Sequence, residues 1–349
     1  MPDPIRVAVL GNSFAARSQL PALRWAGNNE VIGIAGRDLQ KARRTAAEYD
    51  IPTATTDYRD LMAARPDLVL VSTPVNLHRD MTLAAFDAGA AVLCEKPFAL
   101  DATEGAAMVA AARGRPAWVD HQLRWSPHVR AIRQMVADGL IGTPWHVRFE
   151  MLLPTTRFGT RPWSWWFDAD RGGGILGAIG SHMLDLLRWL FGEIETVHCE
   201  LETFVPQRPD AEGTLRPVTA DEYAHLSLGF QSGLRGEVTT SIAIHADHAF
   251  FLQVSGSAGT LRLVDGEQLF HAAPGAALEP LDVEPGLPTA AEVGMRDPGL
   301  FGRCLPLYLR DVIGAVTRGE ADLEDAATFE DGLAIQRVLD AARESAAEG

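Results

Sequence analysis

The segment GGGILGAIGSHMLD, residues 172–185, places three consecutive glycines ahead of a histidine and an aspartate. His182 and Asp185 are three residues apart, so on a helix they project from one side, where the carboxylate can orient the imidazole. Glycines ahead of such a helix are compatible with a phosphate loop, a metal half-site, a catalytic helix or a tightly packed corner. The segment alone leaves these four interpretations open.

A second candidate is AVLGNSFAAR, residues 8–17, which follows an apolar run. Gly11 and Ala16 fit the dinucleotide pattern G-x-G-x-x-G/A, but Ser13 occupies the middle position, where glycine lets the backbone approach the pyrophosphate. A plain tight turn explains the match equally well. Its place after the first strand of an alternating α/β region favours a nucleotide site.

The segment that distinguishes NAD from NADP sites is GIAGRDLQKARR, residues 33–44. NAD sites usually carry a carboxylate at the end of the second strand, whereas NADP sites replace it and supply an arginine. Here Gly36 removes the carboxylate and Arg37 follows, while Asp38 is expected to cap the next helix. The pattern favours NADP(H) over NAD(H), with a solvated surface charge as the alternative for Arg37.

Composition excludes several classes of protein. The chain has 349 residues and a formal net charge of −15, without a basic run for nucleic acid or anionic lipid. Cys94, Cys199 and Cys304 are widely spaced and form no CxxC pair, which is typical of a reducing compartment. With no leader or long apolar run, we expect a cytoplasmic protein that binds neither nucleic acid nor a membrane.

The elements that must position these residues change character near residue 122. Before it, apolar strands such as 5–11, 66–73 and 90–96 alternate with helical patterns, which predicts a doubly wound parallel sheet. After it, the pattern predicts α+β structure with a large, mostly antiparallel open sheet, including a QSG hairpin turn. The predicted domains are 1–122 and 123–349, with closing helices able to pack back on the first. Residues 265–298 are expected to be irregular surface.

Three motifs together resemble the Gfo/Idh/MocA oxidoreductases, the glucose–fructose oxidoreductase and inositol dehydrogenase group. They are VSTPVNLH (71–78), CEKPFAL (94–100) and the glycine–histidine helix (172–192). The resemblance implies a Rossmann domain, a nicotinamide cofactor, and hydride transfer at a secondary alcohol or ketone of a sugar, cyclitol or small diol. It also implies a homodimer or homotetramer formed through the C-terminal sheet.

The resemblance assigns catalytic roles to Lys96, His182 and Asp185, and an often cis peptide bond before Pro97. This chain departs from the family at Ala178, where an aspartate is usual. Ala178 can neither polarise nor accept a proton, so Lys96 and His182 act alone or with another group. The predicted cofactor-binding residues are Gly11, Asn12, Ser13, Phe14, Ala15, Gly36, Arg37, Ser72, Thr73, Pro74, His78, Glu95 and Lys96.

Arg124, Trp165, Trp166 and His182 are the predicted substrate contacts. The indole rings can stack on a sugar or hold an apolar substrate, or they can pack between domains. Arg124 can hold a carboxylate or hydroxyls, or form a structural ion pair. The scattered histidines give no metal-ligand spacing, so no metal is predicted.

Three functional hypotheses follow. The first is an NAD(P)-dependent dehydrogenase with Lys96 as proton donor or acceptor. The second is a lyase or epimerase that retains its cofactor and shows no net redox change. The third is a non-catalytic nucleotide- or sugar-binding regulator, against which the retained Lys96, His182 and Asp185 argue.

Overall fold

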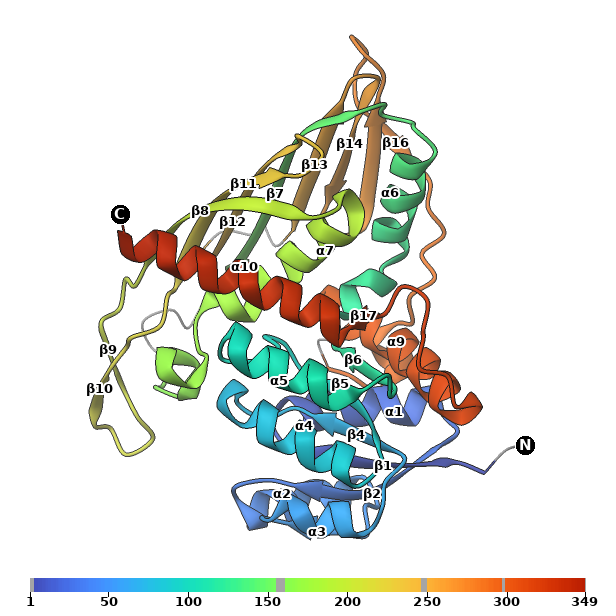
Figure 1. Ribbon diagram of the computed structural model, residues 1–349, viewed down its shortest axis with the longest axis vertical. Coiled ribbons are helices and arrows are strands. Elements are labelled where there is room, and N and C mark those ends of the chain that lie inside the picture. Colours follow the sequence, from blue (N-terminus) through green and yellow to red (C-terminus); the bar gives the residue numbers. More distant parts are fainter. Residues whose placement is uncertain (1–2, 155–160, 246–249, 297–298, 349) are drawn as a thin grey trace. The chain divides into compact units, whose positions relative to one another are not determined.

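The computed structural model describes residues 3–154, 161–245, 250–296 and 299–348 (Figure 1). The chain divides into two compact units. The first comprises residues 1–125 and 287–333, and the second comprises 126–286 and 334–349. The first boundary lies close to the predicted one, but the predicted second domain, 123–349, differs from the second unit because residues 287–333 return to the first.

The first unit contains a seven-stranded sheet in the order β17-β6-β5-β4-β1-β2-β3. Its pairs are parallel except β17–β6, which is antiparallel. The strands are β1 (Ile5–Leu10), β2 (Asn29–Ala35), β3 (Ala54–Thr55), β4 (Leu68–Val71), β5 (Ala91–Cys94), β6 (Ala117–Val119) and β17 (Ala327–Thr328). The predicted doubly wound Rossmann sheet is confirmed.

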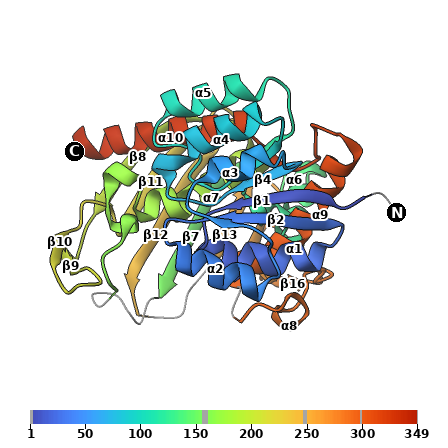
Figure 2. The ribbon, with the colours of Figure 1, turned by 90° about the horizontal axis from the view of Figure 1, so that it is seen from below.

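Helices cover both faces of this sheet. They are α1 (Leu20–Ala26), α2 (Leu39–Glu48), α3 (Tyr58–Ala63), α4 (His78–Asp87), α5 (Ala102–Ala112), α8 (Ala290–Val293) and α9 (Gly299–Arg318). Figure 2 shows α3, α4 and α5 on one side of the strands and α1, α2 and α9 on the other. Because both faces are covered, β4 and β5 are buried throughout, as their apolar sequences predict.

The second unit contains an eight-stranded sheet in the order β16-β15-β14-β13-β7-β12-β11-β8. Only the β7–β12 pair is parallel, so the predicted mostly antiparallel sheet is confirmed. The strands are β7 (Pro144–Pro154), β8 (Ile194–Glu202), β11 (Tyr223–Phe230), β12 (Arg235–Ile244), β13 (Phe251–Gly256), β14 (Gly259–Val264), β15 (Gln268–Ala272) and β16 (Glu279–Leu281).

One face of this sheet is buried and the other is polar. Along β7, Val147 and Phe149 are fully buried, whereas Arg148 points to the opposite face and is exposed. Figure 1 shows helices α6 (Pro127–Ala137) and α7 (Ser181–Phe191) beside this sheet. The last helix is α10 (Phe329–Glu348).

Some short elements were not predicted. The stretch 265–298, expected to be irregular, contains β15, β16 and α8. A separate two-stranded ribbon, β9 (Gln207–Pro209) and β10 (Leu215–Pro217), was also missed. Short strands with proline carry little periodicity, and only pairing with neighbours defines them. Within the described part of the chain, no helix combines the length and apolarity needed to cross a membrane.

Candidate functional site

The turn after β1 requires glycine at position 11. Gly11 has φ +110°, and a Cβ atom there would lie 2.2 Å from the backbone oxygen of Ser72. Its N–H donates to the oxygen of Ala35, which fixes the end of β1 against β2. The carboxyl ends of β1, β2 and β4 therefore meet at this turn, where a doubly wound sheet binds its ligand.

Asn12 fills the space beside Gly36. A Cβ atom on Gly36 would lie 2.9 Å from Asn12 Cγ, so the two positions are mutually fitted. Asn12 is 9% exposed, and among the described residues its Nδ2 atom has no hydrogen-bond partner. A buried N–H without an acceptor is rare and points to an acceptor that a ligand supplies.

Ser13 is exposed, and its hydroxyl accepts a hydrogen bond from Lys41 Nζ at 2.9 Å. Lys41, on the first turn of α2, thus lies over the fingerprint position that lacks glycine. Phe14 is partly buried and Ala15 is fully buried.

After β2, Asp38 caps the next helix, α2, as predicted. Its Oδ1 accepts the Lys41 N–H at 3.0 Å. That backbone N–H holds the pKa of Asp38 below its usual value. Arg37 is exposed. The one carboxylate in this turn is therefore committed to a helix rather than to a ribose.

The turn after β4 is held by His78. Its Nε2 lies 3.0 Å from the oxygen of Thr73 and its Nδ1 lies 3.3 Å from the oxygen of Phe98. Burial lowers the pKa of His78, while the carbonyl groups of Thr73 and Phe98 act in the opposite direction. His78 was predicted to bind cofactor; this geometry gives it a positioning role between the Ser72–Thr73–Pro74 turn and the turn after β5.

Lys96 follows β5 directly, and the Lys96–Pro97 peptide bond is cis, as the resemblance implied. Burial lowers the pKa of Lys96, while the negative charges of Glu95 and Asp120 act in the opposite direction. Glu95 accepts a hydrogen bond from Gln19 Nε2 at 3.2 Å. A lysine with a lowered pKa at the carboxyl edge of the sheet is suited to proton transfer.

Arg124 is engaged within the first unit. It is 3% exposed, and its Nη1 lies 3.3 Å from Asp331 Oδ2 and donates to the oxygen of Asp325 at 3.4 Å. This is the structural ion pair that the sequence left open as an alternative. A substrate contact by Arg124 stays a prediction.

In the second unit, the three glycines form a packed corner. A Cβ atom on Gly173 would lie 2.4 Å from the oxygen of Trp166. Gly174 has φ +107°, and its Cβ would lie 2.2 Å from Asp221 Oδ1. Asp221 Oδ2 accepts the Leu176 N–H at 2.7 Å, so a protein carboxylate already occupies this helix entrance. The glycines therefore form the tightly packed corner, and a catalytic role for the helix that follows them stays a prediction.

His182 lies on the first turn of α7 and Asp185 begins the second, and each residue is 1% exposed. A π-helical turn, Leu176–Gly180, precedes α7 and carries Ala178, which is partly exposed. π-Turns are frequent at functional sites. The structure therefore places His182, Asp185 and Ala178 on consecutive turns.

The aromatic side chains of residues 165–167 divide between core and surface. Phe167 is fully buried, and its ring centroid lies 5.2 Å from that of Trp166. Trp165 and Trp166 are partly exposed. Arg208 is buried in an ion pair with Glu222, and its guanidinium carbon lies 4.3 Å from the ring centroid of Phe167. Packing thus accounts for Phe167, and substrate stacking by the two tryptophans stays a prediction.

Several residues of the site were missed by sequence reasoning. They are Gln19, Lys41, Asp120 and Asp221. β6 ends at Val119, which leaves Asp120 at the carboxyl edge beside Glu95. Aligning the ends of successive strands would have shown this. Asp221 lies 45 residues from Leu176, and no local pattern connects them.

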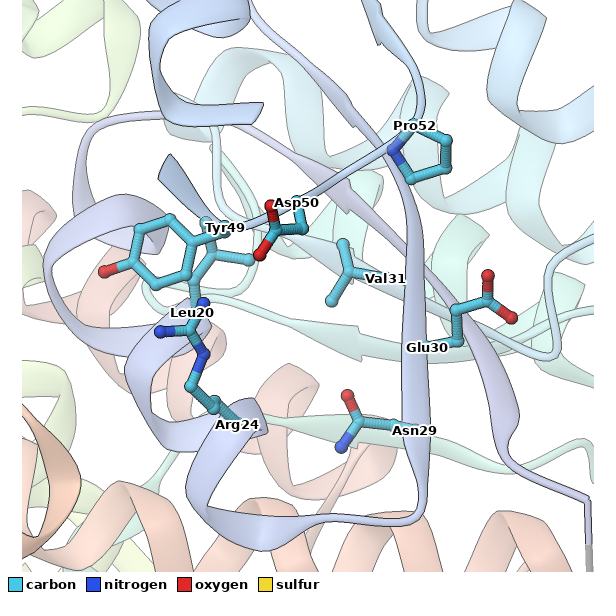
Figure 3. Close-up of a pocket in the computed structure, with 8 residues that line it drawn as sticks. All are labelled: Leu20, Arg24, Asn29, Glu30, Val31, Tyr49, Asp50 and Pro52. Carbon is cyan, nitrogen blue, oxygen red and sulfur yellow. The ribbon is translucent and has the colours of Figure 1, made fainter. Parts of the chain in front are cut away.

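A shallow pocket at the opposite edge of the first sheet is a poor candidate (Figure 3). It includes Asn29 and Glu30 at the amino end of β2, and Tyr49, whose ring centroid lies 5.0 Å from the Arg24 guanidinium. Ligands of doubly wound sheets bind at the carboxyl ends of the strands. Among the described residues, no group of three His, Cys, Asp or Glu side chains could hold a metal ion.

Family models match both parts of the chain. Residues 5–121 match the oxidoreductase family with an NAD-binding Rossmann fold, and residues 129–262 match the GFO/IDH/MocA C-terminal domain. The chain belongs to the Gfo/Idh/MocA oxidoreductase family. The family assignment made from the three motifs is confirmed.

Individual proteins agree with this assignment. An uncharacterized oxidoreductase of Synechocystis sp. is 30% identical over 293 residues, covering 80% of this chain and 79% of that one. Levoglucosan dehydrogenase of Pseudarthrobacter phenanthrenivorans is 28% identical over 286 residues, covering 74% and 73%. A solved levoglucosan dehydrogenase complex with NADH has a TM-score of 0.88 at 24% identity, covering 99% and 98%.

The residues at the carboxyl edge fit a nicotinamide dinucleotide. Gly11 and Gly36 allow the turns to pack closely against Ser72 and Asn12, and Asn12 Nδ2 is a buried donor without a partner among the described residues. Ser13, with Lys41 behind it, presents polar and positively charged groups on the same side. Donors and cations are what phosphate and ribose oxygens require.

Proposed function

We propose that this protein is an NADP(H)-preferring dehydrogenase that acts on a secondary alcohol or ketone of a sugar, cyclitol or small diol. The observation that carries the proposal is Lys96, which follows β5 at the carboxyl edge of a Rossmann sheet and has a pKa lowered by burial. The family and its sugar-dehydrogenase relatives support the substrate class.

In this proposal the dinucleotide is held by the Gly11–Ala15 turn, by Gly36 and Arg37, and by the turns that end at Pro74 and Lys96. The nicotinamide, when bound, supplies the carbon that accepts or donates hydride. Lys96 exchanges a proton with the reacting oxygen: the neutral amine accepts it in oxidation, and the ammonium returns it in reduction. His182 polarises the same oxygen, and Asp185 orients the imidazole.

The preference for NADP(H) depends on Arg37. With Asp38 committed to the cap of α2, no carboxylate in this turn remains to bind a ribose 2′-hydroxyl, and the Arg37 guanidinium can pair with a 2′-phosphate. Arg37→Ala should raise the Kd for NADP(H) about tenfold or more and leave that for NAD(H) within about twofold. Arg43→Ala, which removes a neighbouring exposed charge, is the control. Equal losses for both cofactors would refute the assignment.

The reaction is tested by nicotinamide absorbance with purified protein, NADP⁺ or NAD⁺, and a panel of polyols that includes levoglucosan. Lys96→Ala should lower kcat/KM by about 10²-fold or more. Lys96→Arg keeps the positive charge but has no neutral form at accessible pH, so it should bind cofactor and remain inactive. A fully active Lys96→Ala variant would overturn the mechanism.

Two other outcomes identify the remaining hypotheses. Cofactor that stays bound through purification, with a substrate converted but no change in absorbance, indicates a lyase or epimerase. Ligand binding without conversion of any panel member indicates a regulator.

We also propose that the protein forms a homodimer or homotetramer through the polar face of the eight-stranded sheet. Phe251 on this face is partly exposed, and its ring centroid lies 5.6 Å from the Arg148 guanidinium and 5.7 Å from that of Arg262. An aromatic ring between cations is a common interface anchor. Sedimentation velocity should show an oligomer that Phe251→Glu dissociates; an unchanged oligomer would place the interface elsewhere.

A further inference from the structure

Two carboxyl groups lie side by side immediately beyond the strands of the first sheet. Val71 pairs with Cys94, and Cys94 pairs with Val119, in parallel register. The next residues are Ser72, Glu95 and Asp120, which therefore form a row across β4, β5 and β6. Residues at equal register in parallel strands point to the same face of the sheet, so Glu95 and Asp120 are neighbours.

The donors around this row serve Glu95. Gln19 Nε2 donates to Glu95 Oε1 at 3.2 Å, and Gln19 Oε1 in turn accepts from Ser72 Oγ at 2.5 Å. The Lys96 N–H donates to Glu95 Oε2 at 3.3 Å. Glu95 is thus fixed in place by three elements of the unit.

Asp120 is in a different situation. It is fully buried, and neither of its carboxyl oxygens has a hydrogen bond of good geometry to another described residue. The polar side chains close enough to act on it are the Glu95 carboxyl and the Gln19 amide. Two carboxyl groups bond to each other only when one of them carries a proton, and like charges at this separation cannot both ionise in a buried site.

The surrounding charges favour such sharing. Burial and the charge of Asp120 raise the pKa of Glu95 well above its usual value. Burial raises the pKa of Asp120 to about 6. The other titratable groups that act on the pair come from β5 and the turn after it: Lys96, whose pKa burial lowers, and the Cys94 thiol, whose pKa burial raises. Gln19 and Ser72 are neutral.

We propose that Glu95 and Asp120 share one proton and together carry one negative charge, which stabilises the protonated form of Lys96. The catalytic consequence depends on the function proposed above. In oxidation the substrate hydroxyl proton passes to the neutral Lys96 amine and forms ammonium. The pair keeps its own proton and supplies the counter-charge. Glu95 and Asp120 are positioning residues in this scheme.

The proposal makes a non-additive prediction. If the pair holds one proton, replacing either carboxyl by its amide leaves the other ionised, so the counter-charge to Lys96 persists. Replacing both removes the charge. In the titration of Lys96, the single variants Glu95→Gln and Asp120→Asn should therefore resemble the wild type, and only the double variant should differ.

The chain permits a direct measurement, because Lys41 and Lys96 are its two lysines. The full-length protein, free of cofactor and labelled with ¹³C at lysine Cε, gives two signals that Lys41→Arg assigns. The midpoint of the Lys96 titration should move by less than about 0.3 pH unit in each single variant. In the double variant it should fall by about one pH unit or more. The Lys41 signal is the internal reference.

The matched control is Glu48→Gln with Asp87→Asn, which removes two exposed carboxylates of the same unit. This variant should leave the Lys96 midpoint unchanged. Comparable shifts in both single variants that add in the double variant would show two independent charges and overturn the proposal. An unshifted double variant would show that the pair carries no charge near Lys96 and would overturn it as well.

Infrared spectroscopy gives a second test that does not need the double variant. The wild-type protein at neutral pH should show a C=O band of an un-ionised carboxylic acid, absent from Glu95→Gln and from Asp120→Asn. A band that persists in either variant refutes sharing. Both measurements are made without cofactor or substrate. Their results therefore test the shared proton separately from the dehydrogenase activity: either hypothesis can be refuted while the other holds.

Discussion

Two glycine-containing turns lead into helices in this protein, and they are built for different purposes. The turn at Gly11 leaves Asn12 Nδ2 buried without an acceptor among the described residues. In the turn at Gly172–Gly174, Asp221 accepts the Leu176 N–H at the helix entrance. Glycine before a helix therefore does not by itself indicate an anion site; what faces the first N–H groups of the helix decides.

The largest effect on stability is expected at the Gly172–Gly174 turn, where Asp221 already accepts the helix N–H group. Gly174→Ala combines an unfavourable φ of +107° with a Cβ 2.2 Å from Asp221 Oδ1, and should lower the free energy of unfolding by about 3 kcal/mol. Asp221→Ala should lower it by about 2 kcal/mol, because the Leu176 N–H loses its acceptor. Urea unfolding provides the measurement.

A double-mutant cycle of Gly174→Ala and Asp221→Ala tests whether the two positions are in contact. In the Asp221→Ala background, Gly174→Ala should be less destabilising than in the wild type, because the clashing oxygen is gone. Neither variant should change cofactor affinity in the folded protein. Strict additivity would mean that the backbone conformation, rather than Asp221, requires glycine at position 174.

In the Gly11 turn, a substitution at Asn12 should change cofactor affinity and leave stability nearly unchanged. Asn12→Ala removes a buried donor that has no partner among the described residues, so the free energy of unfolding should stay within about 0.5 kcal/mol or rise. Cofactor affinity should fall about tenfold, the equivalent of one hydrogen bond. Fluorescence titration with NADPH measures the affinity. An unchanged Kd would show that Asn12 Nδ2 is not directed at the dinucleotide.

The stability of the Gly172–Gly174 turn should also depend on pH through Asp221. Burial raises the pKa of this carboxyl above 3.8, more than the Leu176 N–H lowers it. The folded state then holds the proton more tightly than the unfolded state, so this group's contribution to stability falls as pH rises above 3.8. Relative to the wild type, Asp221→Asn should therefore become more stable with rising pH. Unfolding midpoints at pH 4 and pH 7 compare the two proteins, and an opposite trend would contradict the sign.

The smallest effect is expected at Ser13. Ser13→Gly restores the usual fingerprint residue but releases Lys41 from the hydroxyl at 2.9 Å. The site is exposed, so stability should change by less than about 0.5 kcal/mol. NADPH affinity should change by less than about threefold. A large gain in affinity would show that the serine Cβ holds the pyrophosphate away.

Local patterns in the sequence were enough to predict the Rossmann strands, the cap at Asp38 and the turn at Gly11, because each depends on neighbouring residues. The parts that escaped prediction depend on pairing between distant segments. Asp120 becomes a neighbour of Glu95 only through the β5–β6 register, and Asp221 reaches Leu176 from the start of β11. The ion pair of Arg124 with Asp331 likewise connects residues 207 positions apart.

The edge strand β17 has a consequence for the synthesis of the protein. Ala327 and Thr328 complete the first sheet by pairing with Val119 and Trp118 of β6. The second unit similarly contains residues 334–349 in addition to 126–286. On the ribosome, therefore, the first unit lacks its edge strand until residue 328 is translated, and the second unit lacks residues 334–349 until later still. A nascent Rossmann sheet keeps an unpaired edge until then, so chaperone dependence and sensitivity to loss of residues 327–349 are expected properties of this chain.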